Sequence, residues 1–468
     1  MTFTSIEFWI FLAICLLAYW LGKGKTWQNA VLLLAGFVFY ATFNPLYLLL
    51  LFFSIAFDYW VSQRIQASPT GGKGWLWLGL IENILVWLFF KYASQLFLLL
   101  NSSQQITSSA FLPSAFSVLM PIGLSFFTLK KIAYLLDLSR GKISLKPDLL
   151  EYACFVSFFP QLIAGPIDRA QKLIPQMKTA RQWQGRFFEE AWPLILTGLF
   201  KKLVIADGIG VVVEQVYLSL TVSKTIWLIG SFGFAIQVLA DFSGYTDVSR
   251  GVARLLGFET SINFNAPYLS LNFNDFWNRW HITLSSWLRD YIFFPLRRWL
   301  MQVAGKKNTW LSVIVPPLVT MLISGIWHGT GWNFIAWGLF HGVIIAATQL
   351  LGRPASAQTR QPLKIISSWL VTNGLLLLSW ALFCTASLPW LAKVIFQSPW
   401  ISGPADSIVL LSIVYIVFFY LVLYLLEFAI HRWTSEKQWV RSFFYAGMAV
   451  LIFIYSNSVS PDFIYTHF

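Results

Sequence analysis

The sequence predicts an all-α, polytopic integral membrane protein, and three observations support this fold class. Only 11% of the 468 residues are charged, whereas soluble proteins carry about 25%. Hydrophobic residues make up 57% of the chain and aromatic residues 18%. The apolar runs, such as 31–40, 46–60 and 408–428, are long and do not alternate, which favours helices over barrel strands. Because a helical span needs roughly 20 apolar residues, we expect about ten or eleven transmembrane helices.

The N-terminal part predicts five regular spans. The first apolar run, 8–21, has no basic region before it, so we expect no cleavable signal peptide. Lys23 and Lys25 follow this run, and basic loops mark the cytoplasmic side. The N-terminus is therefore expected outside, and basic and uncharged loops then alternate along the chain. The predicted spans are 6–22, 28–42, 46–62, 75–100 and 117–136.

The next apolar segment, 152–167, breaks this alternation because basic loops lie at both of its ends. Pro160 and the pair Gly165-Pro166 interrupt its helix, and broken backbone at membrane depth is tolerated only within protein or around a water-filled cavity. We therefore expect a re-entrant element. The following loop is expected to be cytoplasmic and to attract an anionic donor through Arg169, Lys172, Lys178, Arg181 and Arg186.

The region 187–345 is the least regular, because charges interrupt its apolar runs. It predicts short, oblique helices around a central catalytic cavity. Ordinary spans return at 365–384, 407–428 and 441–456, and the basic loop 352–364 is expected in the cytoplasm. We predict a single membrane domain over 1–468, composed of N-terminal spans (1–114), a catalytic core (115–345) and C-terminal spans (346–468).

Several classes of function are disfavoured. In a membrane protein an excess of Lys and Arg, here a net charge of +13, marks the cytoplasmic loops. No nucleic-acid partner is therefore expected. Cys15, Cys154 and Cys384 lie in apolar sequence without CxxC spacing, which predicts neither a disulfide framework nor a metal site. Zinc HExxH, Walker and GxSxG motifs are missing from the sequence. Any group transfer must therefore use a donor that is already activated.

Two histidines in tryptophan-rich membrane sequence are the leading functional candidates. His281 ends the run Arg-Trp-His, and His328 lies in Trp-His-Gly. An ionisable side chain in or beside a span is costly and is functional by default. Histidine has an unperturbed pKa of about 6.5, which suits proton transfer near neutral pH. This combination predicts an enzyme that works in or at the membrane.

His328 is the predicted central catalyst. A hydroxyl nucleophile must lose its proton as the new bond forms, and a neutral imidazole can take this proton. Trp327 and Trp332 are predicted to form a dry wall beside it. The alternative is a structural histidine that is hydrogen-bonded to a carbonyl of a neighbouring helix.

A second group of candidates surrounds His281. On a continuous helix His281, Ser285 and Arg289 share one stripe, at i, i+4 and i+8, and Asp290 is next to it. This stripe predicts a channel for a phosphate-bearing donor, with Arg289 as the anion contact. The alternative is an interfacial amphipathic helix whose polar face meets lipid head groups.

Three further residues are assigned supporting roles. His341 lies about 140° from His328 on a continuous helix, so the two cannot meet at one atom unless the helix breaks, and we expect a packing or supporting role. Asp241 and Asp247 flank Gly244 in a segment that favours a turn. We expect them to shape the structure or a tunnel and not to form a catalytic carboxylate pair.

Taken together, the sequence blocks that contain these residues resemble the membrane-bound O-acyltransferase family, in particular its bacterial branch that acetylates polysaccharides such as alginate, cellulose and peptidoglycan. The D-alanyl transfer proteins of teichoic acid synthesis are more distant in this resemblance. It is dense over about 115–345, and it assigns His328 as the catalytic histidine and His281 as the second histidine. The blocks are Pro121-Ile-Gly-Leu-Ser-Phe-Phe-Thr128, Phe159-Pro-Gln-Leu-Ile-Ala-Gly-Pro-Ile-Asp-Arg169, Asp241-Phe-Ser-Gly-Tyr-Thr-Asp247, Phe276-Trp-Asn-Arg-Trp-His-Ile-Thr-Leu-Ser285, Trp287-Leu-Arg-Asp-Tyr291 and Trp327-His-Gly followed by His341-Gly.

The resemblance implies a multi-pass O-acetyltransferase component of the bacterial cytoplasmic membrane. It implies an acetyl thioester donor such as acetyl-CoA and no permanently bound cofactor. The expected partners are membrane lipid, a polysaccharide acceptor, an extracytoplasmic acetyltransferase and a polysaccharide synthesis complex. The rival hypothesis is a transporter or flippase for a lipid-linked saccharide, in which His328 only binds. The sequence does not name the acceptor.

Overall fold

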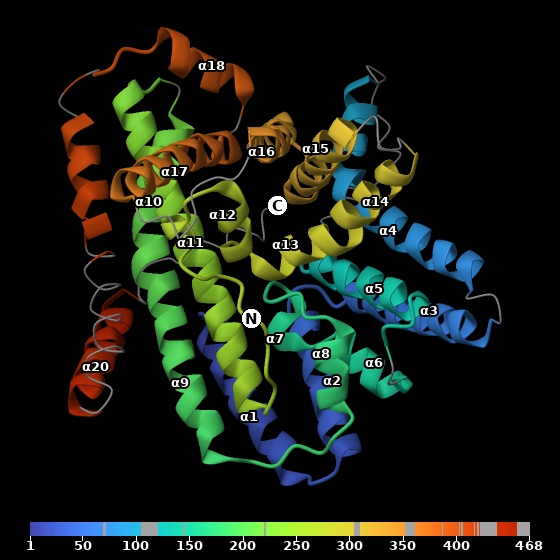
Figure 1. Ribbon diagram of the computed structural model, residues 1–468. Helices are drawn as coiled ribbons and strands as arrows, with labels where there is room; N and C mark the ends of the chain where they lie inside the picture. Colours follow the sequence, from blue (N-terminus) through green and yellow to red (C-terminus); the bar gives the residue numbers. More distant parts are fainter. Residues whose placement is uncertain are drawn as a thin grey trace. The chain divides into compact units, whose positions relative to one another are not determined.

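The computed structural model describes most of the chain, and every regular element in the described part is a helix (Figure 1). The prediction of an all-α fold is confirmed for these residues. The described residues are 1–68, 72–103, 120–143, 146–219, 221–303, 309–351, 361–385, 387–401, 403, 406–415, 417–418, 421 and 438–455.

The chain forms two compact units. The first comprises Met1–Ala191 and Ser249–Ser261, and the second comprises Trp192–Val248 and Ile262–Phe468. Two of the boundaries fall inside helices and the third, at 261/262, falls in a non-helical stretch. None coincides with those predicted at 114/115 and 345/346. The predicted single membrane domain and its three parts stay predictions.

The helices of the first unit agree closely with the predicted N-terminal spans. The length of each apolar run determines the length of the first four helices, and their bounds lie within a few residues of those expected. The fifth begins at Leu124, while residues 117–119 lie outside the described part. The helices are α1 (Ile6–Leu21), α2 (Lys25–Ala41), α3 (Tyr47–Ala67), α4 (Lys73–Ser103), α5 (Leu124–Ser139), α6 (Leu149–Val156), α7 (Phe159–Leu162), α8 (Ala170–Met177) and the start of α9 (Gly185–Phe200).

The segment after α5 is broken, as Pro160 and Gly165-Pro166 predict. Asp148 and Glu151 form a capping box that starts α6, which ends after two turns, and α7 is a single turn. The segment from Glu151 to Asp168 is buried throughout. Such burial is what backbone without regular helical hydrogen bonds requires in a membrane protein. A re-entrant path of this segment stays a prediction.

Several charges of the first unit hold its helices together. Lys131 forms an ion pair with Asp58 at 3.1 Å, and both side chains are buried. Arg181 is also buried, and its guanidinium donates to the Tyr19 hydroxyl at 2.6 Å and to Asn29 Oδ1 at 2.8 Å. Lys178 pairs with Glu151 at 2.8 Å. At least three of the five charges expected to attract a donor, Lys172, Lys178 and Arg181, therefore form polar contacts within the protein.

The second unit contains the short and irregular helices expected in the core. Two π-helices interrupt its helical runs, and long helices frame the shorter ones (Figure 1). Its elements are the rest of α9, π-helix η2 (Lys201–Ala206), α10 (Asp207–Leu218), most of α11 (Lys224–Leu255), 3-10 helix η3 (Pro267–Leu269), α12 (Phe273–Arg279), α13 (Ile282–Leu288), π-helix η4 (Arg289–Phe293), α14 (Phe294–Val303), α15 (Thr309–His328), α16 (Trp332–Leu351), α17 (Pro362–Cys384), α18 (Leu388–Gln397), the helix Asp406–Tyr415 and α20 (Gln438–Tyr455).

The segment from Asp241 to Asp247 is not the turn that the sequence suggested, because it lies inside the long helix α11. Gly244 instead lies where α11 crosses α9 at close range. A Cβ atom at Gly244 would lie 2.7 Å from the carbonyl oxygen of Gly198 on α9. Small residues permit such close approach of helix backbones in membranes.

Six described helices are long and apolar enough to cross a membrane, and three shorter apolar helices accompany them. The six are Tyr47–Ala67, Lys73–Ala93, Lys224–Leu255, Trp310–His328, Trp332–Leu351 and Pro362–Cys384. The three shorter helices are Ile6–Leu21, Asp406–Tyr415 and Trp439–Tyr455. A total of ten or eleven spans stays a prediction. Parts of the expected span 407–428 and most of loop 352–364 lie outside the described residues.

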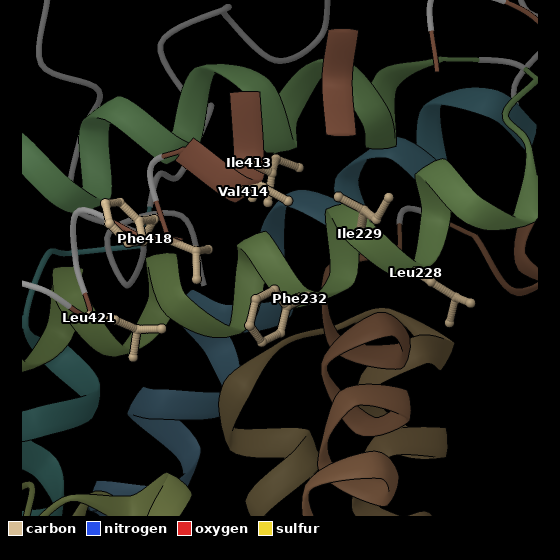
Figure 2. A pocket seen from close by; sticks show the side chains of 8 residues that line it. Leu228, Ile229, Phe232, Ile413, Val414, Phe418 and Leu421 are labelled. Carbon is tan, nitrogen blue, oxygen red and sulfur yellow. The ribbon is translucent and has the colours of Figure 1, made fainter. Parts of the chain in front are cut away.

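An apolar groove of about 420 Å³ lies between α11 and the C-terminal segment of the second unit (Figure 2). Only hydrocarbon side chains line it, and no histidine contributes. It therefore lacks groups for acid–base chemistry and is not the predicted central cavity, which stays a prediction. The lining residues are Leu228, Ile229, Phe232, Ile413, Val414, Val417, Phe418 and Leu421.

Candidate active site

The candidate site is built on the helix pair α15–α16 of the second unit, which packs along its length. Glycines on α16 bring the two backbones together. A Cβ atom at Gly342 would lie 2.9 Å from the Leu318 Cα atom, and one at Gly338 would collide with the Met321 carbonyl oxygen. The spacing Gly-x-x-x-Gly is the small-residue pattern that lets membrane helices approach closely. The residues beside these glycines, Trp337 and His341, are buried as a result.

His328 is the last residue of α15 and is enclosed by aromatic rings. Its imidazole centroid lies 4.9 Å from Trp327, 5.1 Å from Trp337 and 5.2 Å from Phe383. Asn333 donates from Nδ2 to the Phe383 carbonyl at 3.1 Å, which fixes the end of α17 against α16. Of the two residues predicted to form a dry wall, Trp327 contacts His328, whereas Trp332 is 75% exposed. Trp337 and Phe383 also surround the imidazole, and the role of these rings as a dry wall stays a prediction.

His341 joins the same aromatic cluster. A continuous helix through His328 would have kept His341 away from it. However, α15 ends at His328, and the chain reverses before α16 begins at Trp332. Trp337 lies 5.1 Å from His328 and 4.7 Å from His341, centroid to centroid. Neither ring nitrogen of His341 has a hydrogen-bond partner among the described residues. Its supporting role, as the sequence suggested, stays a prediction.

His281 approaches the cluster from another element. It immediately precedes α13, and its ring centroid lies 6.3 Å from Trp327 and 4.7 Å from Phe242 of α11. Trp327 also contacts His328, so one indole connects the two histidines. The exposed fractions of His281, His328 and His341 are 1%, 3% and 1%. The structure thus gathers all three sequence candidates into one buried aromatic cluster.

The backbone of His281 is strained. Its φ is 39°, in the left-handed region, which costs roughly 1–2 kcal/mol for a residue with a Cβ atom. Asn263 holds the adjacent backbone, because its carbonyl oxygen accepts from Ile282 N–H at 2.9 Å and its Oδ1 accepts from the Thr283 hydroxyl at 2.7 Å. Ser285 N–H donates to the His281 carbonyl at 2.9 Å. Strain of this kind persists only where its surroundings enforce it.

The predicted stripe of His281, Ser285 and Arg289 on one continuous helix is wrong. The helix begins only at Ile282, and Arg289 opens the π-helix η4. Ser285 donates its hydroxyl to the Trp280 carbonyl at 2.9 Å. Arg289 is about half exposed, with its Nε 3.6 Å from an oxygen of Asp290. Helical spacing placed these residues incorrectly because backbone geometry changes at both ends of α13.

Asp241 and Asp247 each pair with a lysine of η2. Lys202 lies 3.0 Å from Asp241 and 2.7 Å from Asp207, and Lys201 lies 2.7 Å from Asp247. The acids therefore do not form a carboxylate pair for catalysis. The next residue after Asp241 is Phe242, which contacts His281, so this ion-pair network fixes a helix that borders the site.

Sequence reasoning missed Asn263, Trp337, Phe242 and Phe383. Asn263 sits in a loop with no metal or nucleophile pattern, and Phe383 ends an ordinary span, so neither gave a local signal. Trp337 could have been found, because it stands four residues before His341 and beside Gly338. Their roles arise from contacts between distant segments.

The arrangement suits proton transfer in a dry environment. Imidazoles that are buried among aromatic rings are shielded from water. A neutral imidazole can accept a proton from a hydroxyl that is brought beside it. The site contains no nucleophilic cysteine, and its histidines do not form a cluster of metal-ligand residues within the described part of the chain.

Comparisons with known proteins identify the family of the chain. The sequence model of MBOAT, the membrane-bound O-acyltransferase family, matches residues 84–388. The chain is 34% identical to the probable alginate O-acetylase AlgI of Pseudomonas aeruginosa over 394 residues, which cover 83% of this chain and 73% of the relative. It is 34% identical to the peptidoglycan O-acetyltransferase of Helicobacter pylori, over 84% and 78%. It is also 30% identical to the teichoic acid D-alanyltransferase of Bacillus subtilis, over 48% and 58%.

The family match includes α15, α16 and both histidines, His281 and His328. The apolar helices and this match together identify a multi-pass membrane protein. The predicted resemblance is confirmed. The chain belongs to the membrane-bound O-acyltransferase family and is an O-acyltransferase.

Proposed function

We propose that the protein moves an acetyl group from a cytoplasmic thioester, acetyl-CoA, across the bacterial cytoplasmic membrane. The acetyl group then O-acetylates an extracytoplasmic polysaccharide, directly or through a partner acetyltransferase. The observation that carries this proposal is the connection of His281 and His328 through the indole of Trp327, at 6.3 and 4.9 Å, in a buried aromatic cluster.

In the proposed reaction His328 is the general base. A hydroxyl oxygen of the acceptor forms a bond with the acyl carbon while a ring nitrogen of His328 takes its proton. The carbon–sulfur bond then breaks, and the proton passes from His328 to the leaving thiolate. Trp327, Trp337 and Phe383 exclude water that would otherwise hydrolyse the thioester. His281 borders the acyl group on the other side of Trp327.

The geometry of α15 and α16 supports access for an acceptor from outside. Each helix has 20 residues, and about 30 Å of helix spans the hydrocarbon core. Lys306 and Lys307 precede α15, and Arg353 and Arg360 follow α16. Basic residues favour the cytoplasm, so the turn after His328 faces the opposite side. The donor then has to enter from the cytoplasm to reach the same histidine.

The acceptor class follows from the relatives. The relatives are named for alginate, peptidoglycan and teichoic acid, which are polymers that carry hydroxyl groups. A hydroxyl-bearing polymer on the outer side of the membrane fits a base near the outer end of α15. A partner acetyltransferase could take the acetyl group through its own hydroxyl by the same chemistry. Arg289, which is about half exposed, is the residue we assign to the anionic part of the donor.

The decisive experiment replaces His328 by Ala and by Gln in the producing bacterium. Acetate released by mild alkali from the purified surface polysaccharide is measured, normalised to the protein found in membranes. Loss of a general base costs typically 10²–10⁴-fold, and we expect this loss for both variants. His467→Gln makes the same chemical change near the C-terminus, outside the described residues, and should retain wild-type acetate.

The glutamine variant separates acyl transfer from transport. A transporter that uses His328 only to bind a saccharide tolerates a polar replacement, so wild-type acetate in His328→Gln would contradict the proposal. The donor is tested with inside-out membrane vesicles supplied with acetyl-labelled acetyl-CoA. Label should appear on polysaccharide or partner protein with wild-type vesicles and not with His328→Ala vesicles.

A further inference from the structure

We infer that Asn263 is a positioning residue, which holds the His281 backbone in its left-handed conformation and thereby aims the imidazole at Phe242 and Trp327. This inference rests on the proposed function, because it gives His281 a place in the acyl-transfer site. Asn263 precedes Phe264-Asn265-Ala266 in a non-helical stretch.

The contacts of Asn263 all reach the residues that follow His281. Its backbone oxygen accepts from Ile282 N–H at 2.9 Å. Its side-chain Oδ1 accepts from Thr283 N–H at 3.3 Å and from the Thr283 hydroxyl at 2.7 Å. A further backbone bond joins Asn265 N–H to the Arg279 carbonyl at 3.0 Å. The loop is therefore hydrogen-bonded to the chain on both sides of His281.

The chemistry of the carboxamide supports this role. Asn263 is buried, and its Oδ1 serves two donors while its Nδ2 has no hydrogen-bond partner among the described residues. A buried donor without a partner is unfavourable, so the favourable contribution of this carboxamide comes from its acceptor oxygen. The first N–H groups of a helix lack partners within the helix. Asn263 satisfies those of Ile282 and Thr283 from outside, and so fixes where α13 begins.

The start of α13 sets the direction of the His281 ring. The φ and ψ angles of a residue determine where its Cα–Cβ bond points. With φ at 39°, the His281 ring lies edge-on to Phe242 at 4.7 Å and 6.3 Å from Trp327. If His281 relaxed to a right-handed or extended conformation, its imidazole would point elsewhere. A displacement of about 1 Å in a reacting group can reduce the rate by about 10²-fold.

Three variants test the inference in the full-length protein. Asn263→Leu keeps a similar volume and removes the acceptor oxygen. Thr283→Val removes only the hydroxyl donor, and Thr283→Ser keeps it as the matched control. Each protein is purified in lipid nanodiscs for structure determination by electron cryo-microscopy. Transfer of labelled acetate from acetyl-CoA is measured in inside-out vesicles as kcat and as KM for acetyl-CoA.

We expect Asn263→Leu to move His281 out of the left-handed region and to lower kcat by about 10²-fold, with KM for acetyl-CoA nearly unchanged. Thr283→Val should lower kcat by about fivefold, and Thr283→Ser should match the wild type. If Asn263→Leu does not fold, the comparison of Thr283→Val with Thr283→Ser tests the inference. Equal kcat values for that pair would then overturn the inference.

Two other outcomes also count against the inference. If His281 keeps φ near 39° in Asn263→Leu, the Asn263 side chain does not hold the His281 backbone, even when activity falls. If His281 moves and kcat does not change, the orientation of His281 is irrelevant to the reaction. The proposed function itself fails separately, through wild-type acetylation by His328→Gln.

Discussion

The rings of His328 and Trp337 meet edge to face, with centroids 5.1 Å apart and an interplanar angle of 84°. Nine positions separate them along the chain, and the reversal between α15 and α16 brings them together. Because this indole also contacts His341 at 4.7 Å, it is the packing element on which two imidazoles depend.

Truncation of Trp337 should therefore impair both stability and catalysis. A buried tryptophan replaced by alanine costs about 3–5 kcal/mol, and displacement of His328 costs about 10²-fold in rate. Trp337→Phe keeps an aromatic edge and should lose less of both. Thermal unfolding of the purified protein and acetate content of the surface polysaccharide are the measurements. Trp332→Ala, at an exposed position, is the control, and equal behaviour of the two alanine variants would contradict the prediction.

The buried charge of Lys202 should be essential for folding. Removal of one partner from a buried ion pair costs about 3–5 kcal/mol, because the other charge is left uncompensated. Lys202→Met leaves Asp207 and Asp241 without their cation, so its thermal midpoint should fall strongly. Lys201→Met should lose less, since Lys201 and Asp247 are both partly exposed.

A compensated variant gives the sharper test of this network. Lys202→Met combined with Asp207→Asn and Asp241→Asn removes the cation and both acids together. We expect it to recover most of the stability lost by Lys202→Met alone. No recovery would show that the lysine acts through packing and not through its charge.

The topology prediction can be tested at Gln184, which is exposed in the loop before α9. A single cysteine there, with Cys15, Cys154 and Cys384 replaced, should resist an impermeant thiol reagent in intact cells and react once the cells are opened. A cysteine at exposed Pro45, in the turn predicted outside, should react in intact cells. The reverse pattern would overturn the assigned orientation.

Acid should weaken the anchoring of α6 through Glu151. Burial acts to raise the pKa of this carboxyl, but hydrogen bonds from Lys178, the Asp148 N–H and Lys25 outweigh burial and hold the pKa below its ordinary value. A depressed pKa contributes stability above the unfolded-state pKa of about 4.3, and the contribution disappears as pH falls through the folded-state pKa. Thermal midpoints between pH 7 and pH 3 measure this loss.

Glu151→Gln is the control for the acid effect. This variant lacks the titrating group, so its stability at pH 7 should be lower than that of the wild type and should depend less on pH over the same range. An identical pH dependence of the two proteins would assign the acid sensitivity to other carboxyls.

The sequence predicts the long helices well, because apolar length alone determines them. The span expected at 365–384 is α17, Pro362–Cys384, and the one expected at 46–62 is α3, Tyr47–Ala67. The break between α6 and α7 also follows from local chemistry, since proline removes a helical hydrogen bond. His281 and His328 were identified by the cost of placing imidazoles in membrane sequence.

The remainder of the site depends on contacts that have no local signal. Helical spacing assigned His281 to a stripe with Arg289, but Asn263 forces a left-handed residue at that point. A glycine between two acids suggested a turn at Gly244, whereas the glycine permits close passage of α9. In both cases a partner far away in the chain overrides the preference of the local sequence.

In the π-helix η2 the number of residues matters as much as their identity. Lys202 lies at its start and Asp207 directly after its end, and the two side chains pair at 2.7 Å. Removal of one residue between them would convert this π turn into an α turn and rotate α10 by about 100° relative to α9. Lys202 and Asp207 would remain neighbours at i,i+4, but α10 would no longer present the face that now packs on α11. Leu203, Ile205 and Ala206 are buried, so they tolerate only side chains of similar volume. We therefore expect functional relatives to keep the number of residues between Lys202 and Asp207 unchanged.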